Sequence, residues 1–137
     1  FLLDNGNIDN SNLDNGNIDN SNIDNYNDLC KYNKKIDERK ALLSFFVNLF
    51  KNDNDNIKII SNVLEKLLNN FQENINNENK KINNEEITDL IYIITTNIEI
   101  SNYIGKLKEI TEYSPKKYSG ITNKIIFKFM DIIDIYE

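Results

Sequence analysis

Three closely spaced carboxylates, Glu85, Glu86 and Asp89, are the best candidates for acid–base chemistry in this chain. Paired carboxylates can hydrolyse a glycosidic bond when one acts as an acid and the other as a base or nucleophile. These three fall at the predicted start of a helix, where the helix dipole stabilises negative charge. Because that structural role accounts for all three, we predict no catalytic residue among them.

Histidine is absent from the sequence, which excludes Ser–His and Cys–His nucleophile pairs and a zinc site with histidine ligands. The four glycines, Gly6, Gly16, Gly105 and Gly120, are too widely spaced for a phosphate-binding loop or a dinucleotide fingerprint. The single cysteine, Cys30, is expected to have no chemical role. We therefore predict a protein that is not an enzyme and that holds no cofactor and no metal.

A basic cluster is the best candidate for a nucleic-acid or nuclear-localisation patch, and it consists of Lys31, Tyr32, Lys34, Lys35, Arg39 and Lys40. Asp37 and Glu38 lie inside this cluster and an acidic segment precedes it, so a solvated helix start is the favoured interpretation. Four later tyrosines are expected at the core or its rim, because no sheet is predicted to display them to bases: Tyr92, Tyr103, Tyr113 and Tyr118. The sequence predicts no nucleic-acid partner.

The formal charge of −6 lies entirely in the first thirty residues, which contain six aspartates and no basic side chain. The remainder is balanced and gives no electrostatic footprint for nucleic acid or an anionic membrane. The longest apolar stretch, Leu42 to Phe50, is too short to cross a bilayer, so we expect a soluble protein with no membrane partner. One cysteine and no N-glycosylation acceptor favour the cytoplasm or nucleus. Because the sequence begins with Phe1 and not with methionine, we expect it to be a piece of a longer protein.

Residues 1–30 form an asparagine- and aspartate-rich repeat tract, in which the decapeptide LDNGNIDNSN occurs twice from Leu3 and the underlying period is five. One aliphatic residue in five buries too little surface to offset the backbone entropy lost on ordering, about 1–2 kcal/mol per residue. We therefore predict a disordered tract over 1–30 and a helical domain over 31–137.

Two ordered alternatives exist for the tract. The tract has a small residue two places before each aliphatic residue, and in this it resembles the pentapeptide-repeat β-solenoids. The resemblance covers barely one coil of such a solenoid. The many Asp and Asn side-chain oxygens of the tract suggest a calcium-binding site. If Gly16 is aligned with the invariant glycine of an EF-hand loop, however, Ser11, Leu13 and Asn22 fall at ligand positions. Because those ligands do not fit, we predict no calcium site.

Apolar residues at spacings of three and four predict five amphipathic helices after the tract. The first begins near Ile36 with Asp37 as its cap and carries the stripe that runs from Leu42 to Phe50. The second runs from Asn56 to Ile75, capped by Asp55 or Asn56, and is predicted to bury two leucines and expose three polar residues: Leu64 and Leu67, against Glu65, Lys66 and Asn69.

The later helices have weaker signals. Asn83 and Glu86 have the spacing of a capping box for the third helix, although the β-branched run from Leu90 to Thr96 leaves a strand as the alternative. Ser101 is predicted to cap the fourth helix, Ser114-Pro115 to end it, and SPKKYSG to form a surface loop before a last helix from Ile121 to Tyr136.

Five such helices joined by short loops fit either an antiparallel bundle or a short α-solenoid in an all-α fold. The segment from Leu42 to Leu68 resembles an armadillo or HEAT unit in having an apolar helix, a short NDND turn and a longer apolar helix. We interpret the domain as a non-catalytic protein–protein interaction or scaffold module with an unknown protein partner. The alternative is a structural fragment or insertion of a larger low-complexity protein whose function lies elsewhere in that chain.

Overall fold

The computed structural model describes residues 23–136, and residues 1–22 and 137 lie outside the described part. The predictions of disorder, of a pentapeptide-like solenoid and of calcium binding for residues 1–22 therefore lie outside it as well. Within residues 23–136 there are five α-helices and no strand, which confirms the all-α prediction: α3 (Ile23–Phe50), α4 (Asn54–Asn74), α5 (Lys81–Thr95), α6 (Ile104–Thr111) and α7 (Asn123–Tyr136).

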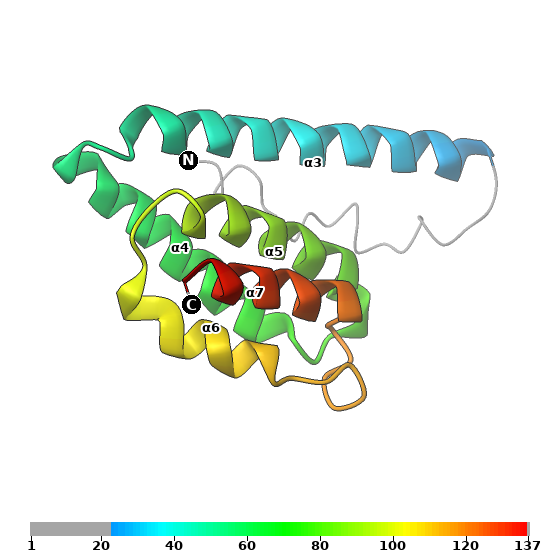
Figure 1. The fold of residues 1–137 in the computed structure, drawn as a ribbon. Helices are drawn as coiled ribbons and strands as arrows, with labels where there is room; N and C mark the ends of the chain where they lie inside the picture. Colours follow the sequence, from blue (N-terminus) through cyan, green and yellow to red (C-terminus); the bar gives the residue numbers. More distant parts are fainter. Residues whose placement is uncertain (1–22, 137) are drawn as a thin grey trace.

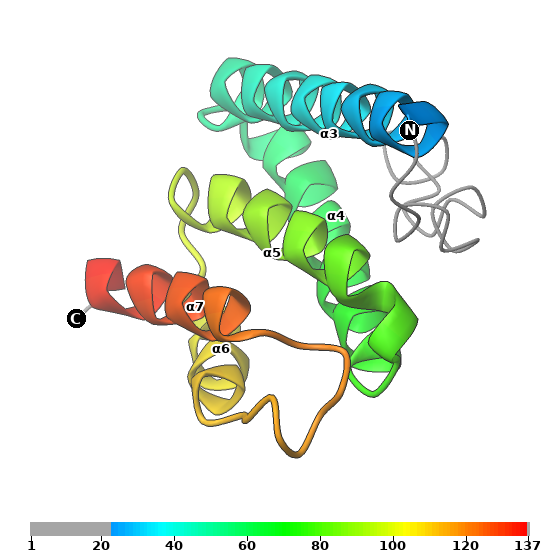
Figure 2. The same ribbon diagram turned by 90° about the vertical axis from the view of Figure 1, so that its right-hand side faces the viewer.

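The helices alternate between two layers, as in an α-solenoid (Figure 1). In one layer α3, α5 and α7 lie side by side and run in the same direction, with α5 in contact with both neighbours. Figure 2 shows the second layer, in which α4 and α6 run the opposite way on one side of the first. The arrangement arises because each short connection reverses the chain. Of the two predicted packings, the described residues adopt the solenoid.

The first helix begins earlier than the periodicity predicts, at Ile23 in place of a residue near Ile36. Asp37 consequently lies in the middle of α3 and caps nothing. The cause is a second run of apolar residues, at a spacing of three and four, which continues the inner face toward the N-terminus through Ile36, Tyr32 and Leu29. The helix thus begins inside the segment that the sequence assigns to the repeat tract.

Two predicted helix starts are also displaced. Asp53, and neither Asp55 nor Asn56, caps α4, because one of its carboxylate oxygens accepts hydrogen bonds from the backbone N–H groups of Asp55 and Asn56. These bonds lower the pKa of the Asp53 carboxyl. The capping box predicted from Asn83 and Glu86 is wrong, since α5 already begins at Lys81 and both residues are buried within it.

The connection from α5 to α6 contains a short 3-10 turn at Ser101–Tyr103, in place of the side-chain cap that the sequence predicts at Ser101. The Glu99 carboxylate accepts hydrogen bonds from the Ser101 backbone N–H, at 2.7 Å, and from its hydroxyl, at 3.0 Å. The helix α6 then ends at Thr111, three residues before Ser114-Pro115. The Leu90–Thr95 run is helical, so the strand alternative is wrong.

The core is formed by the apolar faces of α4, α5, α6 and α7, with a smaller contribution from α3. Leu64 and Leu67 are fully buried, whereas Glu65, Lys66 and Asn69 are exposed, which confirms the predicted orientation of α4. The largest buried pair is Phe71 with Phe129, whose ring centroids lie 5.3 Å apart. The α4 face therefore contacts a helix nearly sixty residues later in the chain.

Replacing Leu64 with alanine should lower the free energy of unfolding by about 2–5 kcal/mol, since a fully buried leucine leaves a cavity. Lys66→Ala on the exposed side of the same helix should change it by less than about 0.5 kcal/mol. Urea unfolding followed by circular dichroism measures both values. Equal midpoints for the two variants would contradict the orientation of α4.

The loop before α7 lies at the surface as predicted, with Lys116, Lys117 and Ser119 exposed, and its last residue is fixed to the end of α4. The Gly120 backbone N–H donates to the Ile75 carbonyl at 2.6 Å, and the Asn84 amide nitrogen bridges the carbonyls of Asn74 and Gly120 at 3.1 and 2.7 Å. A Cβ atom on Gly120 would overlap the Asn74 carbonyl oxygen, so only glycine allows this approach. The end of α4, the first half of α5 and the loop before α7 are thereby joined at Gly120.

Candidate interaction surface

The three carboxylates singled out in the sequence all lie on α5, where each contacts a side chain from outside that helix. Glu86 accepts two hydrogen bonds from the Arg39 guanidinium of α3, at 2.6 and 2.8 Å. Asp89 lies 2.7 Å from the Lys40 ammonium and 3.9 Å from that of Lys128 on α7. The first turn of α5 contains no acidic residue, so the prediction that they complement the helix dipole is wrong.

The remaining carboxylate, that of Glu85, accepts a hydrogen bond from the Thr122 hydroxyl at 3.0 Å. Thr122 in turn accepts one from the backbone N–H of Ile125 at 3.3 Å and so caps α7. All three side chains therefore hold helices together, and the structure gives each a packing role.

The Arg39–Glu86 pair is an enclosed polar contact between α3 and α5, with side-chain exposures of 11% and 0%. Its parallel fork geometry is the strong form of a charge-assisted hydrogen bond. The bonds to Glu86 raise the pKa of Arg39, while burial acts in the opposite direction. Lys128 also lies over the Tyr92 ring, 4.1 Å from its centroid. A polar seam thus joins α3, α5 and α7 across the layer.

The seam divides the predicted basic cluster into two groups. Arg39 and Lys40 are directed at α5 and are partly covered, and Tyr32 is buried. Three lysines of the cluster stay exposed on the outer side of α3: Lys31, Lys34 and Lys35. The cluster is therefore partly an inter-helix contact and partly a surface feature.

Large apolar side chains also lie on the exposed side of α3. Leu42, Phe45 and Leu49 are 50%, 65% and 59% exposed, and their spacing of three and four places them on one line, which we call the outer stripe. Phe46 and Phe50, with ring centroids 4.9 Å apart, border it and are half-buried. Single exposed apolar residues are normal, but three on one line of one helix are characteristic of an interaction surface.

The outer stripe belongs to α3, which is the helix at one end of the layer that contains α3, α5 and α7 (Figures 1 and 2). Among the described residues α3 has α5 as its main neighbour and touches α4 near the connecting turn, so its far side carries no further helix. At the opposite end of the layer α7 exposes Phe127 and Met130. Both ends of this short stack therefore present apolar side chains, where a solenoid usually has a polar cap.

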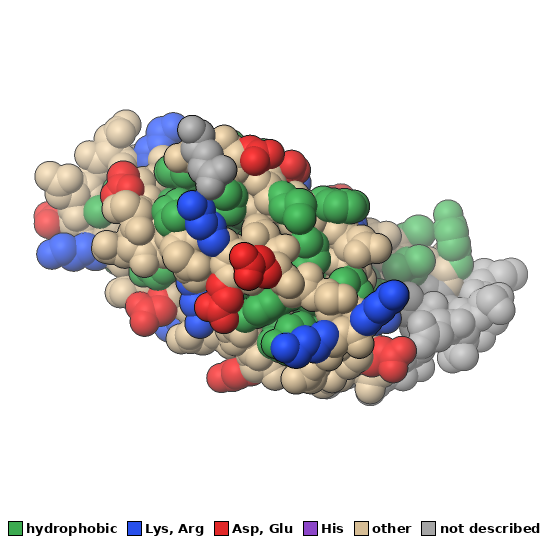
Figure 3. Space-filling view, turned by 60° about the horizontal axis from the view of Figure 1, so that its bottom comes forward, with side chains coloured by type: hydrophobic (Ala, Val, Ile, Leu, Met, Phe, Trp, Pro, Cys, Tyr) green, Lys and Arg blue, Asp and Glu red, His purple; other side chains and the backbone are tan. Residues whose placement is uncertain are grey.

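Figure 3 shows the face that carries α6 and α7, where acidic, basic and hydrophobic side chains are interspersed. No large patch of one charge sign appears on this face, in agreement with the balanced charge of the helical residues.

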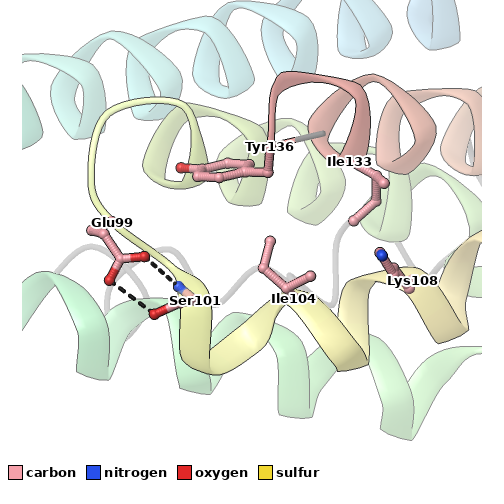
Figure 4. Close-up of a pocket in the computed structure, with 6 residues that line it drawn as sticks. All are labelled: Glu99, Ser101, Ile104, Lys108, Ile133 and Tyr136. Carbon is pink, nitrogen blue, oxygen red and sulfur yellow. Dashed lines mark hydrogen bonds between the residues drawn. The ribbon is translucent and has the colours of Figure 1, made fainter.

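A hollow of about 200 Å³ lies between α6 and the C-terminal turn of α7, and six residues line it: Glu99, Ser101, Ile104, Lys108, Ile133 and Tyr136 (Figure 4). The polar groups at its edge already have structural partners. Glu99 holds the Ser101 turn, and the Tyr136 hydroxyl donates to the carbonyls of Thr95 and Ile98. Burial raises the pKa of Tyr136. We interpret this hollow as a packing feature.

The four tyrosines predicted at the core or its rim are all half-buried. Tyr113 and Tyr118 pair with ring centroids 4.8 Å apart, Tyr92 lies beneath Lys128, and Tyr103 packs against the core. Cys30 is exposed on α3. Within residues 23–136 no three cysteine or carboxylate side chains converge as a metal site would require.

No helix in the described part of the chain has the length and apolar character needed to cross a membrane. In comparisons with protein-family models, with curated proteins and with solved structures, no match to this chain was found.

Proposed function

We propose that the helical domain is a non-catalytic protein–protein interaction module and that it binds its partner through the outer stripe of α3. The observation that supports this proposal is the line of three large apolar side chains, Leu42, Phe45 and Leu49, each at least half exposed at the end of a helix layer. Apolar residues at i, i+3 and i+7 are the anchors by which helices dock on one another.

The partner surface that fits is an amphipathic helix. One line of residues along α3 has alternating spacings of four and three, which is the spacing of a coiled-coil seam. It consists of Lys31, Lys35, Glu38, Leu42, Phe45 and Leu49. A partner helix would pack its own apolar line on the outer stripe. It would bear acidic residues near the exposed lysines, where opposite charges favour association.

Apolar contact alone gives limited affinity at this site. Burying the exposed half of three large side chains contributes about 4 kcal/mol, since full burial of one contributes about 1.5–3 kcal/mol. Association costs about 4–15 kcal/mol in lost translational and rotational freedom. Ion pairs with Lys31, Lys34 and Lys35 and the contacts of the partner's own side chains must supply the difference. The proposed module is intracellular, cytoplasmic or nuclear, and its partner is a protein.

Site-specific photocrosslinking in the cells that produce the protein tests this proposal. Benzoylphenylalanine in place of Phe45 should give abundant adducts with one protein, because that ring is 65% exposed on the outer stripe. The matched control carries the same group in place of Lys66, which is exposed on α4 in the other layer. Adduct yields at Phe45 no higher than at Lys66 would overturn the proposal, and the structural-fragment alternative would replace it.

A further inference from the structure

The connection between α6 and α7 contains a serine that is followed by the only proline of the chain, Ser114-Pro115. Lys116 and Lys117 come next, and both are exposed. Figures 1 and 2 show this connection as a loop that projects from the helices, on the opposite side of the molecule from α3. The loop is therefore separate from the outer stripe.

Ser114 begins a turn whose hydrogen bonds are made within the loop. Its hydroxyl oxygen accepts a hydrogen bond from the Lys116 backbone N–H at 3.2 Å. Its carbonyl accepts two more, from the backbone N–H groups of Lys117 at 3.0 Å and Tyr118 at 2.9 Å. The serine side chain is thus held at the start of the turn, with its oxygen beside a backbone donor.

The loop is attached to the rest of the domain on both sides of this turn. Before the turn, the Gln72 amide of α4 donates to the Tyr113 hydroxyl at 3.3 Å. After the turn, the Ser119 hydroxyl donates to the Asn76 carbonyl at 2.7 Å. Residues 114–117 lie between these two attachments. Because the hydrogen bonds of the turn are its own, the turn can open into an extended segment while the helices stay packed.

The Ser114 hydroxyl also differs from those of the two other described serines outside the α-helices. Ser101 donates its hydroxyl to the Glu99 carboxylate at 3.0 Å, and Ser119 donates to Asn76. The Ser114 oxygen instead acts as an acceptor. A serine that becomes a nucleophile must give its proton to a base, so a hydroxyl that donates to a neighbouring group is less suited to this reaction.

The residues after Ser114 determine the class of enzyme that fits it. Proline disfavours a helical conformation in the residue before it, so Ser114 favours extended backbone. Because Pro115 has no N–H, the enzyme must accept a ring at this position without forming a hydrogen bond to it. Lys116 and Lys117 match acidic groups farther along the substrate cleft. Among enzymes that modify serine, these requirements describe the proline-directed protein kinases.

We propose that Ser114 is a phosphorylation site for a proline-directed protein kinase, with ATP as the phosphoryl donor. The serine oxygen bonds to the γ-phosphorus while an aspartate of the kinase takes the hydroxyl proton. The bond between that phosphorus and the bridging β-phosphate oxygen breaks, and ADP leaves with its magnesium ion. This inference goes beyond the proposed function and does not depend on the outer stripe.

The folded turn has groups that can hold the phosphate. The Lys116 backbone N–H already faces the serine oxygen, and two exposed ammonium groups follow two and three residues along the chain, on Lys116 and Lys117. One exposed carboxylate, that of Glu112, lies two residues earlier. A phosphate of about −2 charge is stabilised by N–H groups and cations, so we expect it to be accommodated without loss of helix.

Phosphoryl transfer by a purified cyclin-dependent kinase with Mg-ATP tests the site on the full 137-residue chain. The intact mass should rise by one phosphoryl group, and tandem mass spectrometry should place that group on Ser114. Ser114→Ala should take up none. Ser101→Ala, which removes an exposed serine outside the α-helices, should take up one. No uptake by the unaltered chain, or equal uptake by Ser114→Ala, would overturn the inference.

Pro115→Ala tests the class of kinase. Alanine restores an N–H that has no partner in the cleft of a proline-directed kinase, so the rate of transfer to Ser114 should fall at least about tenfold. Helical circular dichroism should stay unchanged, since the turn lies outside the helices. An unchanged rate of transfer would overturn the assignment to proline-directed kinases.

Phosphorus NMR of the phosphorylated chain measures whether the turn holds the phosphate. The N–H group and the two ammonium groups favour the dianion, so the second pKa of the phosphate should lie below its usual value of about 6. Replacing both lysines, as Lys116→Gln with Lys117→Gln, should raise this pKa toward that value. An equal pKa in both forms would overturn the role given to the lysines.

The protein from the cells that produce it provides the last test. Purified with phosphatases inhibited, a fraction of the chain should carry a phosphate on Ser114, detected by tandem mass spectrometry. Absence of phosphate on Ser114 throughout the cell cycle would overturn the site. Neither result bears on crosslinking at Phe45, so this inference and the proposed function fail independently.

Discussion

Replacing Gly120 with alanine should lower the free energy of unfolding by about 3 kcal/mol, at the upper end of overpacking effects. The added methyl group would overlap the Asn74 carbonyl oxygen and lie 2.7 Å from that of Ile75, and these are backbone atoms that cannot rotate away. Relief requires the loop to lift from α4, which would break the 2.6 Å hydrogen bond from Gly120 to Ile75. Urea unfolding measures the change.

Gly105 provides the matched control for this substitution. It lies in α6, and a methyl group added there would have no atom within 4 Å. Gly105→Ala should therefore raise the free energy of unfolding by about 0.5–1 kcal/mol through helix propensity. The same substitution should therefore lower the free energy of unfolding at Gly120 and raise it at Gly105. A Gly120→Ala variant as stable as the unaltered chain would show that the loop does not dock on α4 in this way.

Arg39→Met should lower the free energy of unfolding by about 3–5 kcal/mol, because it leaves the fully buried Glu86 carboxylate without its counter-charge. Lys40→Met on the next position of α3 removes an ion pair whose side chains are 32% and 22% exposed. Solvent screens that pair, so its loss should cost at most about 1 kcal/mol. Thermal and urea unfolding of the two variants give the comparison.

The double variant Arg39→Met with Glu86→Leu identifies the cause. If an uncompensated charge is responsible, removal of Glu86 as well should recover most of the lost stability, since an apolar pair replaces the buried ion pair. A double variant that is less stable than Arg39→Met alone would contradict this explanation. It would show that the shape of the two side chains matters more than their charge.

The sequence was sufficient to predict the class of fold and the orientation of its most periodic helix. In α4 the buried leucines and the exposed polar residues repeat along the helix, so local spacing alone determines which side faces the core. Asn83 and Glu86 were misassigned because their three-residue spacing fits a capping box, whereas in the fold both are buried within α5 and Glu86 pairs with Arg39. That partner, Arg39, is 47 residues away. Gly120 depends likewise on Asn74 and Ile75, which no local pattern connects to it.

The outer stripe is visible in the sequence as an excess of apolar residues. By their spacing five residues form one broad apolar stripe: Leu42, Leu43, Phe46, Leu49 and Phe50. A helix that packs against a single neighbouring helix needs only a narrow apolar stripe. In the structure only Leu43 of these five is buried, and Leu42 and Leu49 lie on the exposed side with Phe45. Which residues face inward depends on the position of α5, and that position is a property of the whole fold.

The layered order of the helices also determines how the domain loses structure. The central helix α5 packs against α3, α4 and α7, whereas α3 is attached mainly along one side, through α5. In a stack in which contacts are made between neighbours, opening free energies fall from the middle toward the ends. Fraying of α3 would separate Arg39 from Glu86 and leave α4 to α7 packed on their own core. A partner on the outer stripe would therefore slow amide hydrogen exchange in α3 far more than in α5.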